Sequence, residues 1–154
     1  MEHEDVRRQR APAVATFYTE ADDDPLGLEP FKPDQSWKER RRTGFGDGYS
    51  NTRDLFRFAR AFRTGELLGR DMMPVMTGSK VDQDGRGTYY AYGLTEKTVN
   101  GEVVRGHTGG GRADVEILWD SGYTVIVLKN ATPPTANAFG SEIIDFITKQ
   151  VAAR

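Results

Sequence analysis

The dipeptide Asn100-Gly101 constrains the fold of this chain more than any other feature of the sequence. Before it, apolar residues alternate at Tyr90, Tyr92 and Leu94. An Asn-Gly pair next to such a stretch is the strongest short signal for a β-hairpin, because both residues tolerate the positive φ angles that a tight turn requires. Two antiparallel strands are therefore predicted, over residues 88–99 and 102–107.

Two further strands are predicted after this hairpin. Val115, Ile117 and Trp119 alternate with other residues, and Asp120-Ser121-Gly122 then turns the chain. The segment Tyr123–Leu128 is almost continuously apolar, which is typical of a strand covered on both faces. The sequence thus predicts an antiparallel meander.

Helices are predicted on both sides of the meander. Apolar residues recur at helical spacing at Leu55, Phe58, Ala59 and Phe62, and again at Ile143, Ile144, Ile147 and Val151. Ser50 or Asn51 can cap the first helix and Gly65 can end it, and a shorter helix is expected over residues 71–76. Trp119 and Phe139 are expected in the core. The predicted fold class is α+β, an antiparallel sheet with packed helices.

Residues 1–48 differ from the rest of the chain. They hold 4 of the 7 prolines and a basic run at Lys38–Arg42, and they carry 8 Lys+Arg against 11 Asp+Glu. This balance favours a solvated loop over a nucleic-acid site. We expect a mostly irregular segment over 1–48 and an α+β domain over 49–154.

Composition excludes several kinds of function. The net charge of −2 predicts no nucleic-acid partner, and no apolar run approaches the ~20 residues of a membrane span. Without cysteine the chain has no thiol nucleophile or thiolate metal site, and its compartment stays open. We expect no metal and no cofactor, and the polar residues 1–10 are not expected to form a signal peptide.

The stretch Arg105–Gly111 is the most informative candidate for chemistry. A predicted strand ends with His107 and Thr108, and three glycines follow. Consecutive glycines let another backbone approach closely, and their N–H groups can bind an oxyanion. The simpler alternative is a glycine-rich bend beside a solvent-facing histidine.

Several segments, in order, resemble the family of serine β-lactamases, DD-peptidases and family VIII esterases. Gly48-Tyr-Ser-Asn-Thr-Arg-Asp-Leu-Phe-Arg-Phe58 resembles its "GYST-x-x-DL-x-RF" helix start, and Tyr92-Gly93-Leu94 resembles its "YGYGL" strand. Gly106-His-Thr-Gly-Gly110 resembles its third active-site box, and Ala113–Asn130 resembles its last two strands. The resemblance spans residues 45–152.

The resemblance implies roles for individual residues. His107 would face the nucleophile and its bases, and Thr108 would donate a hydrogen bond to a substrate carboxylate. Gly109 would leave room for the substrate backbone, and Gly110 N–H would form one arm of the oxyanion hole. His107, Thr108 and Gly110 are thus the implied catalytic residues, and Gly109 and Gly111 complete the substrate-binding set.

The chain also departs from this family. None of its serines is followed by lysine at the Ser-x-x-Lys spacing of the nucleophile box, and Thr77-Gly-Ser-Lys80 copies that spacing with threonine only. Tyr49-Ser50-Asn51 matches the Tyr-x-Asn second box literally, but it opens the predicted helix, so we interpret it as a cap. The attacking group is therefore missing.

We accordingly expect a C-terminal fragment or truncated homologue that is inactive alone, without the helical domain and first strands of the family. Its complete relative would act on a β-lactam, a D-Ala-D-Ala peptide or a small ester. The alternatives are a non-catalytic module that binds peptidoglycan peptides and a protein-interaction module. The loss of neighbouring strands would leave Tyr123–Leu128 as an open sheet edge, which favours a homodimer or domain swap.

Overall fold

The computed structural model describes residues 15–19, 31–33, 46, 48–110, 112–132 and 135–153. The chain divides into two compact units, Met1–Tyr49 and Ser50–Arg154. In the first unit, the short strands β1 (Tyr18–Thr19) and β2 (Lys32–Pro33) pair antiparallel. The predicted basic run Lys38–Arg42 lies outside the described residues.

The second unit contains an antiparallel sheet whose strand order is β3-β4-β5-β6-β7-β8. Its strands are β3 (Val81–Asp82), β4 (Tyr89–Tyr90), β5 (Thr95–Val99), β6 (Glu102–Gly109), β7 (Ala113–Leu118) and β8 (Thr124–Leu128). Each strand pairs antiparallel with the next one along the chain. The predicted meander, and with it the α+β class, is confirmed.

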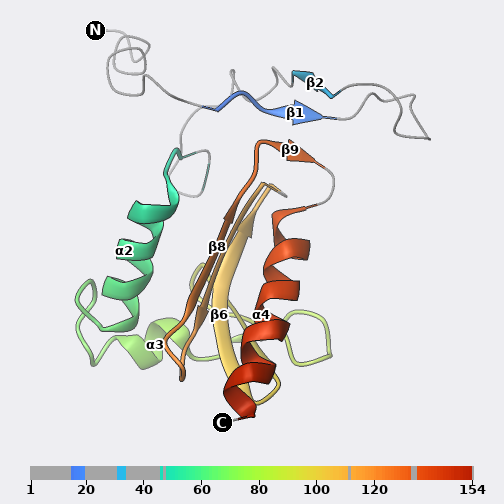
Figure 1. Cartoon of the computed structure of the whole chain (residues 1–154). Helices are drawn as coiled ribbons and strands as arrows, with labels where there is room; N and C mark the ends of the chain where they lie inside the picture. Colours follow the sequence, from blue (N-terminus) through green and yellow to red (C-terminus); the bar gives the residue numbers. More distant parts are fainter. Residues whose placement is uncertain are drawn as a thin grey trace, which may run out of the picture. The chain divides into compact units, whose positions relative to one another are not determined.

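Helices cover both faces of this sheet. Helix α2 (Thr52–Arg63), followed by α3 (Met73–Thr77), lies on one face, and α4 (Ala136–Ala152), which comes after the short strand β9 (Ala131–Thr132), lies on the other (Figure 1). The core on the α2 face contains Ala59, Phe62, Met73 and Ile117. The core on the α4 face contains Val104, Leu118, Val125 and Ile144.

The hairpin between β5 and β6 turns at the predicted dipeptide. Asn100 has a φ of 49° and Gly101 a φ of 85°, as a tight primed turn requires. The predicted strand over 88–99, however, is interrupted. Ala91 N–H donates to Leu94 C=O at 2.8 Å and Gly93 has a φ of 78°, so a turn separates β4 from β5.

Two predictions about apolar residues have different outcomes. Trp119 is half-buried and packs edge-on against Phe62, with ring centroids 6.2 Å apart. Phe139 was predicted in the core, which is wrong, because 41% of it is exposed. Helix α4 places other residues against the sheet: Ala136, Gly140, Ile144 and Thr148. Phe139 lies to one side of this buried face.

Candidate active site

The end of strand β6 projects beyond its neighbour β5. The last pair between the two strands joins Thr95 to Gly106, and Thr95 Oγ1 also donates to Gly106 C=O at 3.1 Å. Strand β6 continues for three residues, His107–Gly109, which among the described strands pair with β7 alone. Backbone groups of an antiparallel strand point alternately to its two sides. Thr108 N–H and C=O therefore point away from β7, toward the space beyond the end of β5.

Gly109 ends strand β6, and Gly110 lies in the turn that leads to β7. Gly109 C=O accepts a hydrogen bond from Arg112 N–H at 3.0 Å. Gly110 has a φ of 54°, and a Cβ at this position would meet no atom within 4 Å. Gly111, predicted to bind substrate, lies outside the described residues. The glycine-rich bend with an exposed histidine is thus present, and the free edge at Thr108 is an additional feature beside it.

His107 lies at the mouth of an apolar cavity on the α2 face. Its Nε2 is 3.4 Å from the hydroxyl of Tyr90, and the two rings meet edge-on with centroids 6.2 Å apart. The cavity has a volume of about 290 Å³. It is lined by Leu55, Phe58, Phe62, Met76, Tyr92, Gly93, Leu94, Gly106, His107, Val115 and Ile117. An apolar group of a substrate held at the β6 edge would find room there.

On the opposite face, Thr108 pairs with Asp114 of β7. Asp114 is 1% exposed, and burial raises the pKa of its carboxyl group to about 6, aided by the charge of nearby Glu116 and opposed by that of Lys97. Glu116 is buried as well and forms an ion pair with Lys97 at 2.9 Å. A titratable carboxyl group therefore lies directly across the strand from a predicted site residue.

Sequence reasoning did not single out Asp114 and Glu116. They alternate with Val115 and Ile117, a pattern that is typical of a strand with one solvated face. The available signal was Gly140 in the closing helix, since a glycine in a helix interior indicates close packing. A Cβ at Gly140 would overlap the Asp114 carboxylate.

Hydroxyl groups near this region are already engaged. Thr77, the threonine with the Ser-x-x-Lys spacing, is buried and donates to Met73 C=O at 2.8 Å. Ser79 donates to Glu96 at 2.7 Å. Asn51 Oδ1 accepts from Asp54 N–H at 3.0 Å, so Asn51 is the N-cap of α2, as predicted. Thr77 bonds to a backbone carbonyl, which cannot act as a base, and the carboxylate that accepts from Ser79 also forms an ion pair with Arg105 at 2.6 Å.

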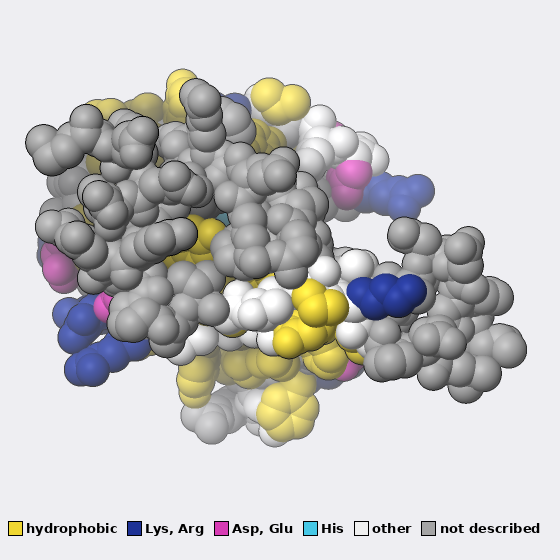
Figure 2. Space-filling model, turned by 90° about the horizontal axis from the view of Figure 1, so that it is seen from above, with side chains coloured by type: hydrophobic (Ala, Val, Ile, Leu, Met, Phe, Trp, Pro, Cys, Tyr) yellow, Lys and Arg dark blue, Asp and Glu magenta, His cyan; other side chains and the backbone are white. Residues whose placement is uncertain are grey.

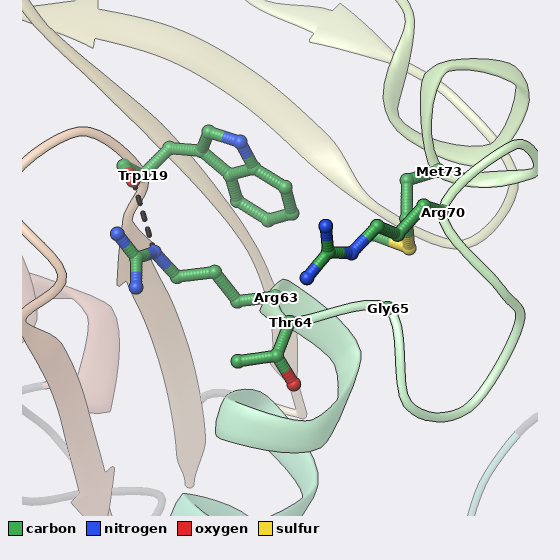
Figure 3. A pocket seen from close by; sticks show the side chains of 6 residues that line it. All are labelled: Arg63, Thr64, Gly65, Arg70, Met73 and Trp119. Atoms are coloured by element: carbon green, nitrogen blue, oxygen red, sulfur yellow. Dashed lines mark hydrogen bonds between the residues drawn. The ribbon is translucent and has the colours of Figure 1, made fainter.

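A larger hollow, of about 430 Å³, lies near the C-terminal end of α2 (Figure 3). It is lined by Arg63, Thr64, Gly65, Arg70, Met73 and Trp119. Arg63 Nε donates to Trp119 C=O at 2.9 Å. Because this hollow contains none of the residues of the His-Thr-Gly strand, we assign the candidate site to the smaller cavity and the β6 edge.

Two further properties concern the described residues only. They contain no group of three or more His, Cys, Asp or Glu side chains that is arranged to hold a metal ion. No helix among them has the length and apolar character needed to cross a membrane.

The geometry defines a class: an antiparallel sheet between helices, with a His-Thr-Gly strand end that is open on one side. The family model described as Beta-lactamase matches residues 3–147. The chain therefore belongs to the β-lactamase family, and the family predicted from sequence is confirmed. No curated protein and no solved structure matches the chain.

Proposed function

We propose that this chain provides the substrate-holding strand of a serine acyl-transfer hydrolase and forms no acyl-enzyme by itself. The observation that supports the first part most directly is the free edge of β6 at Thr108, beyond the last residue pair with β5. The second part rests on the sequence, which contains no Ser-x-x-Lys box.

In this proposal each residue of the β6 edge has its own role in binding or catalysis. An extended substrate pairs with Thr108 N–H and C=O as an added strand, while the Thr108 hydroxyl donates to a substrate carboxylate. Gly109 leaves room for the substrate backbone, and Gly110 N–H donates to the developing oxyanion. His107 assists proton transfer at the mouth of the cavity. The nucleophile is the group that this set lacks.

The substrate class that fits is an acyl compound with an amide or ester bond: a β-lactam, a D-Ala-D-Ala peptide or a small ester. Each presents a carbonyl that becomes an oxyanion on attack, and the first two also present a carboxylate. The apolar walls of the cavity beside His107 support substrates that carry an apolar group near the scissile bond.

A first experiment tests the lack of a nucleophile. The chain is incubated with a reporter penicillin and its intact mass is measured. We expect no covalent adduct, because no serine of the chain is followed by lysine at the Ser-x-x-Lys spacing and Thr77 is buried and bonded to Met73 C=O. An adduct of stoichiometric mass would disprove this part of the proposal and would identify its own site by peptide mapping.

A second experiment tests the strand. The upstream, nucleophile-bearing part of an active serine β-lactamase is joined to residue 45 of this chain, and penicillin hydrolysis by the folded chimera is measured. We expect hydrolysis, and Gly110→Val should reduce kcat by about 10² to 10³ because an oxyanion donor is displaced. Gly87→Val is the matched control, since Gly87 also has a positive φ and open space around it. A folded chimera that is inactive, or equal losses in both variants, would contradict the proposal.

The alternative is a binding module that holds peptidoglycan-like peptides without cutting them. The same free edge supports it, because pairing with a peptide needs no nucleophile. This function requires that the chain alone bind a D-Ala-D-Ala peptide saturably, with loss of binding in Gly110→Val and retention in Gly87→Val. NMR titration with the peptide distinguishes the two, since the hydrolase proposal places the other half of the binding site on the nucleophile-bearing part.

We also propose that β8 is a site of strand pairing. In the described part of the sheet its one neighbour is β7. Tyr123 C=O and Lys129 N–H bond to the β7 side, at Leu118 and Arg112, so by alternation Thr124, Ile126 and Leu128 turn their backbone groups outward. Such a row of free donors and acceptors is a template for another strand.

Amide hydrogen exchange, followed by NMR, tests this pairing. If another strand covers β8, the amide protons of Thr124, Ile126 and Leu128 exchange as slowly as those of Val125 and Val127, which face β7. Fast exchange confined to the three outward amides would show that the edge is unpaired.

A further inference from the structure

Helix α4 carries an apolar stripe that its own sheet does not cover. Phe139, Ile143 and Phe146 are spaced along one side of the helix and are 41%, 42% and 65% exposed. The helix buries a different row against the sheet: Ala136, Gly140, Ile144 and Thr148. We call Phe139, Ile143 and Phe146 the α4 stripe. Exposed apolar residues that line up in this way are typical of an interaction surface.

Contacts at the two sides of α4 show where this stripe lies. Thr148 and Asp145 accept hydrogen bonds from Asn100 Nδ2, at 2.9 and 3.1 Å, so one side of the helix faces the β5–β6 hairpin. On the other side, the ammonium group of Lys129 lies 4.8 Å from the ring centroid of Phe139. Lys129 directly follows β8. The α4 stripe is therefore on the side of the helix that faces the outer edge of β8.

The edge and the stripe together form one apolar surface. Figure 1 looks toward the β8 edge of the sheet, with α2 and α4 on its two sides. In Figure 2, hydrophobic side chains are exposed in several places, including the lower side of the view, which is the side that faces the reader in Figure 1. Tyr123 and Leu128, at the two ends of β8, are 46% and 40% exposed. This surface joins free backbone groups with apolar side chains.

The chemistry of this surface suits a second copy of the same surface. Tyr123–Leu128 contains no charged residue, and neither do the three positions of the α4 stripe; Glu142, three residues after Phe139, borders the stripe. A surface that pairs with itself about a twofold axis must not set like charges against each other, and the residues of β8 and of the α4 stripe are uncharged. When the β8 strands of two copies pair antiparallel with Ile126 opposite Ile126, Thr124 of each copy lies opposite Leu128 of the other. Every residue whose backbone groups point outward then has a partner in the second copy.

We propose that two copies of this chain form a continuous sheet through antiparallel β8–β8 pairing about a twofold axis at Ile126. This inference rests on the strand pairing proposed above for β8. The axis places the two α4 helices on the same face of the joined sheet. The α4 stripes of the two copies then cover each other, which removes Phe139, Ile143 and Phe146 from water.

The mass of the chain in solution tests whether the partner is a second copy. Light scattering during gel filtration should give twice the chain mass of 17.2 kDa. Two variants should give the monomer mass: Phe146→Lys, which puts like charges in the paired stripes, and Ile126→Pro, which removes an outward N–H but leaves pairing with β7 intact. Ser141→Lys, exposed on the side of α4 away from the stripe, is the matched control and should remain dimeric. Circular dichroism checks that each variant is folded.

A single introduced cysteine tests the register of the β8–β8 pairing, since the natural sequence has no cysteine that could interfere. Under mild oxidation Ile126→Cys should form a disulfide-linked dimer, since the twofold axis brings the two Cα atoms within disulfide reach. Thr98→Cys, exposed on β5 away from this edge, should not. A monomeric natural chain at high micromolar concentration, or a dimer that persists in both Phe146→Lys and Ile126→Pro, would overturn the inference. If the chain is monomeric but the amide protons of Thr124, Ile126 and Leu128 exchange slowly, β8 pairs with a different strand.

Discussion

At the scale of single residues, the most unusual feature is the pair of carboxyl groups on β7 beneath helix α4. Asp114 and Glu116 are 1% and 2% exposed, and one cation, Lys97, forms an ion pair with Glu116. Asp114 Oδ1 has no hydrogen-bond partner among the described residues. Burying a carboxylate without full compensation is costly, so the group responds by holding its proton to higher pH.

This response predicts how stability depends on pH. The pKa of Asp114 is raised from 3.8 to about 6 in the folded state. Between these values the folded chain holds a proton that the unfolded chain has lost, so the contribution of Asp114 to the free energy of unfolding falls as pH rises from about 4 to about 6 and is constant beyond. We expect Asp114→Asn to remove this dependence and to raise stability at pH 7.5 by about 2 kcal/mol. Urea unfolding of both proteins across the pH range checks this, and a less stable variant at pH 7.5 would refute it.

Gly106 shows how closely the sheet is packed next to the candidate site. A Cβ at this position would overlap the carbonyl oxygen of Val115 and the carboxylate of Glu116. Because a backbone carbonyl cannot move aside without breaking the strand ladder, we expect Gly106→Ala to lower the free energy of unfolding by about 3 kcal/mol. Gly109→Ala is the control, since its Cβ would lie 3.7 Å from that of Ala113, and it should change stability by less than about 1 kcal/mol. Equal losses in the two variants would count against this packing argument.

At the scale of elements, α2 depends on its first turn. Asn51 Oδ1 accepts from Asp54 N–H, and Asn51 Nδ2 donates to the Asp54 carboxylate at 2.8 Å. Asp54 also lies near the positive end of the helix dipole. The literal match of Tyr49-Ser50-Asn51 to a second active-site box is thus explained by capping, because the Asn51 side chain binds the backbone of its own helix.

We expect Asn51→Ala to lower the free energy of unfolding by about 1 kcal/mol, since a backbone N–H of the first turn loses its acceptor. Asn51→Ser retains an acceptor, so its free energy of unfolding should fall by only a few tenths of that amount. Chemical unfolding followed by circular dichroism measures both. If serine were as damaging as alanine, the cap would not be the source of the stability.

At the scale of the whole molecule, the second unit is a sheet with helices on both faces whose last strand has a neighbour on one side among the described residues. A protein that associates only when folded gains stability with concentration. The proposed β8–β8 dimer therefore predicts a Tm that rises with protein concentration in the natural chain and in Ser141→Lys, but not in Phe146→Lys. Differential scanning calorimetry over a hundredfold dilution, about the range in which such linkage is easily seen, provides the measurement. A Tm independent of concentration in all three would speak against the dimer.

Local signals in the sequence account for most elements of the second unit. The Asn100-Gly101 turn, the cap at Asn51 and the helical spacing of Ile144 and Ile147 each act over a few residues, so their structural consequence does not depend on distant parts of the chain. The His-Thr-Gly strand end was predicted in the same way. The break between β4 and β5 was not, because alternation continued across a turn that Gly93 makes possible.

The sequence by itself determined the antiparallel meander, its flanking helices and the absence of a Ser-x-x-Lys motif, because these follow from local conformational preference and residue identity. Only the tertiary structure decided that β5 stops short of Thr108, that Asp114 is buried beneath Gly140, and that Phe139 faces the edge of β8 rather than the core. Each of these depends on which surfaces meet when the strands and helices pack. The free energy of such contacts comes from residues far apart in the sequence, which no local pattern encodes.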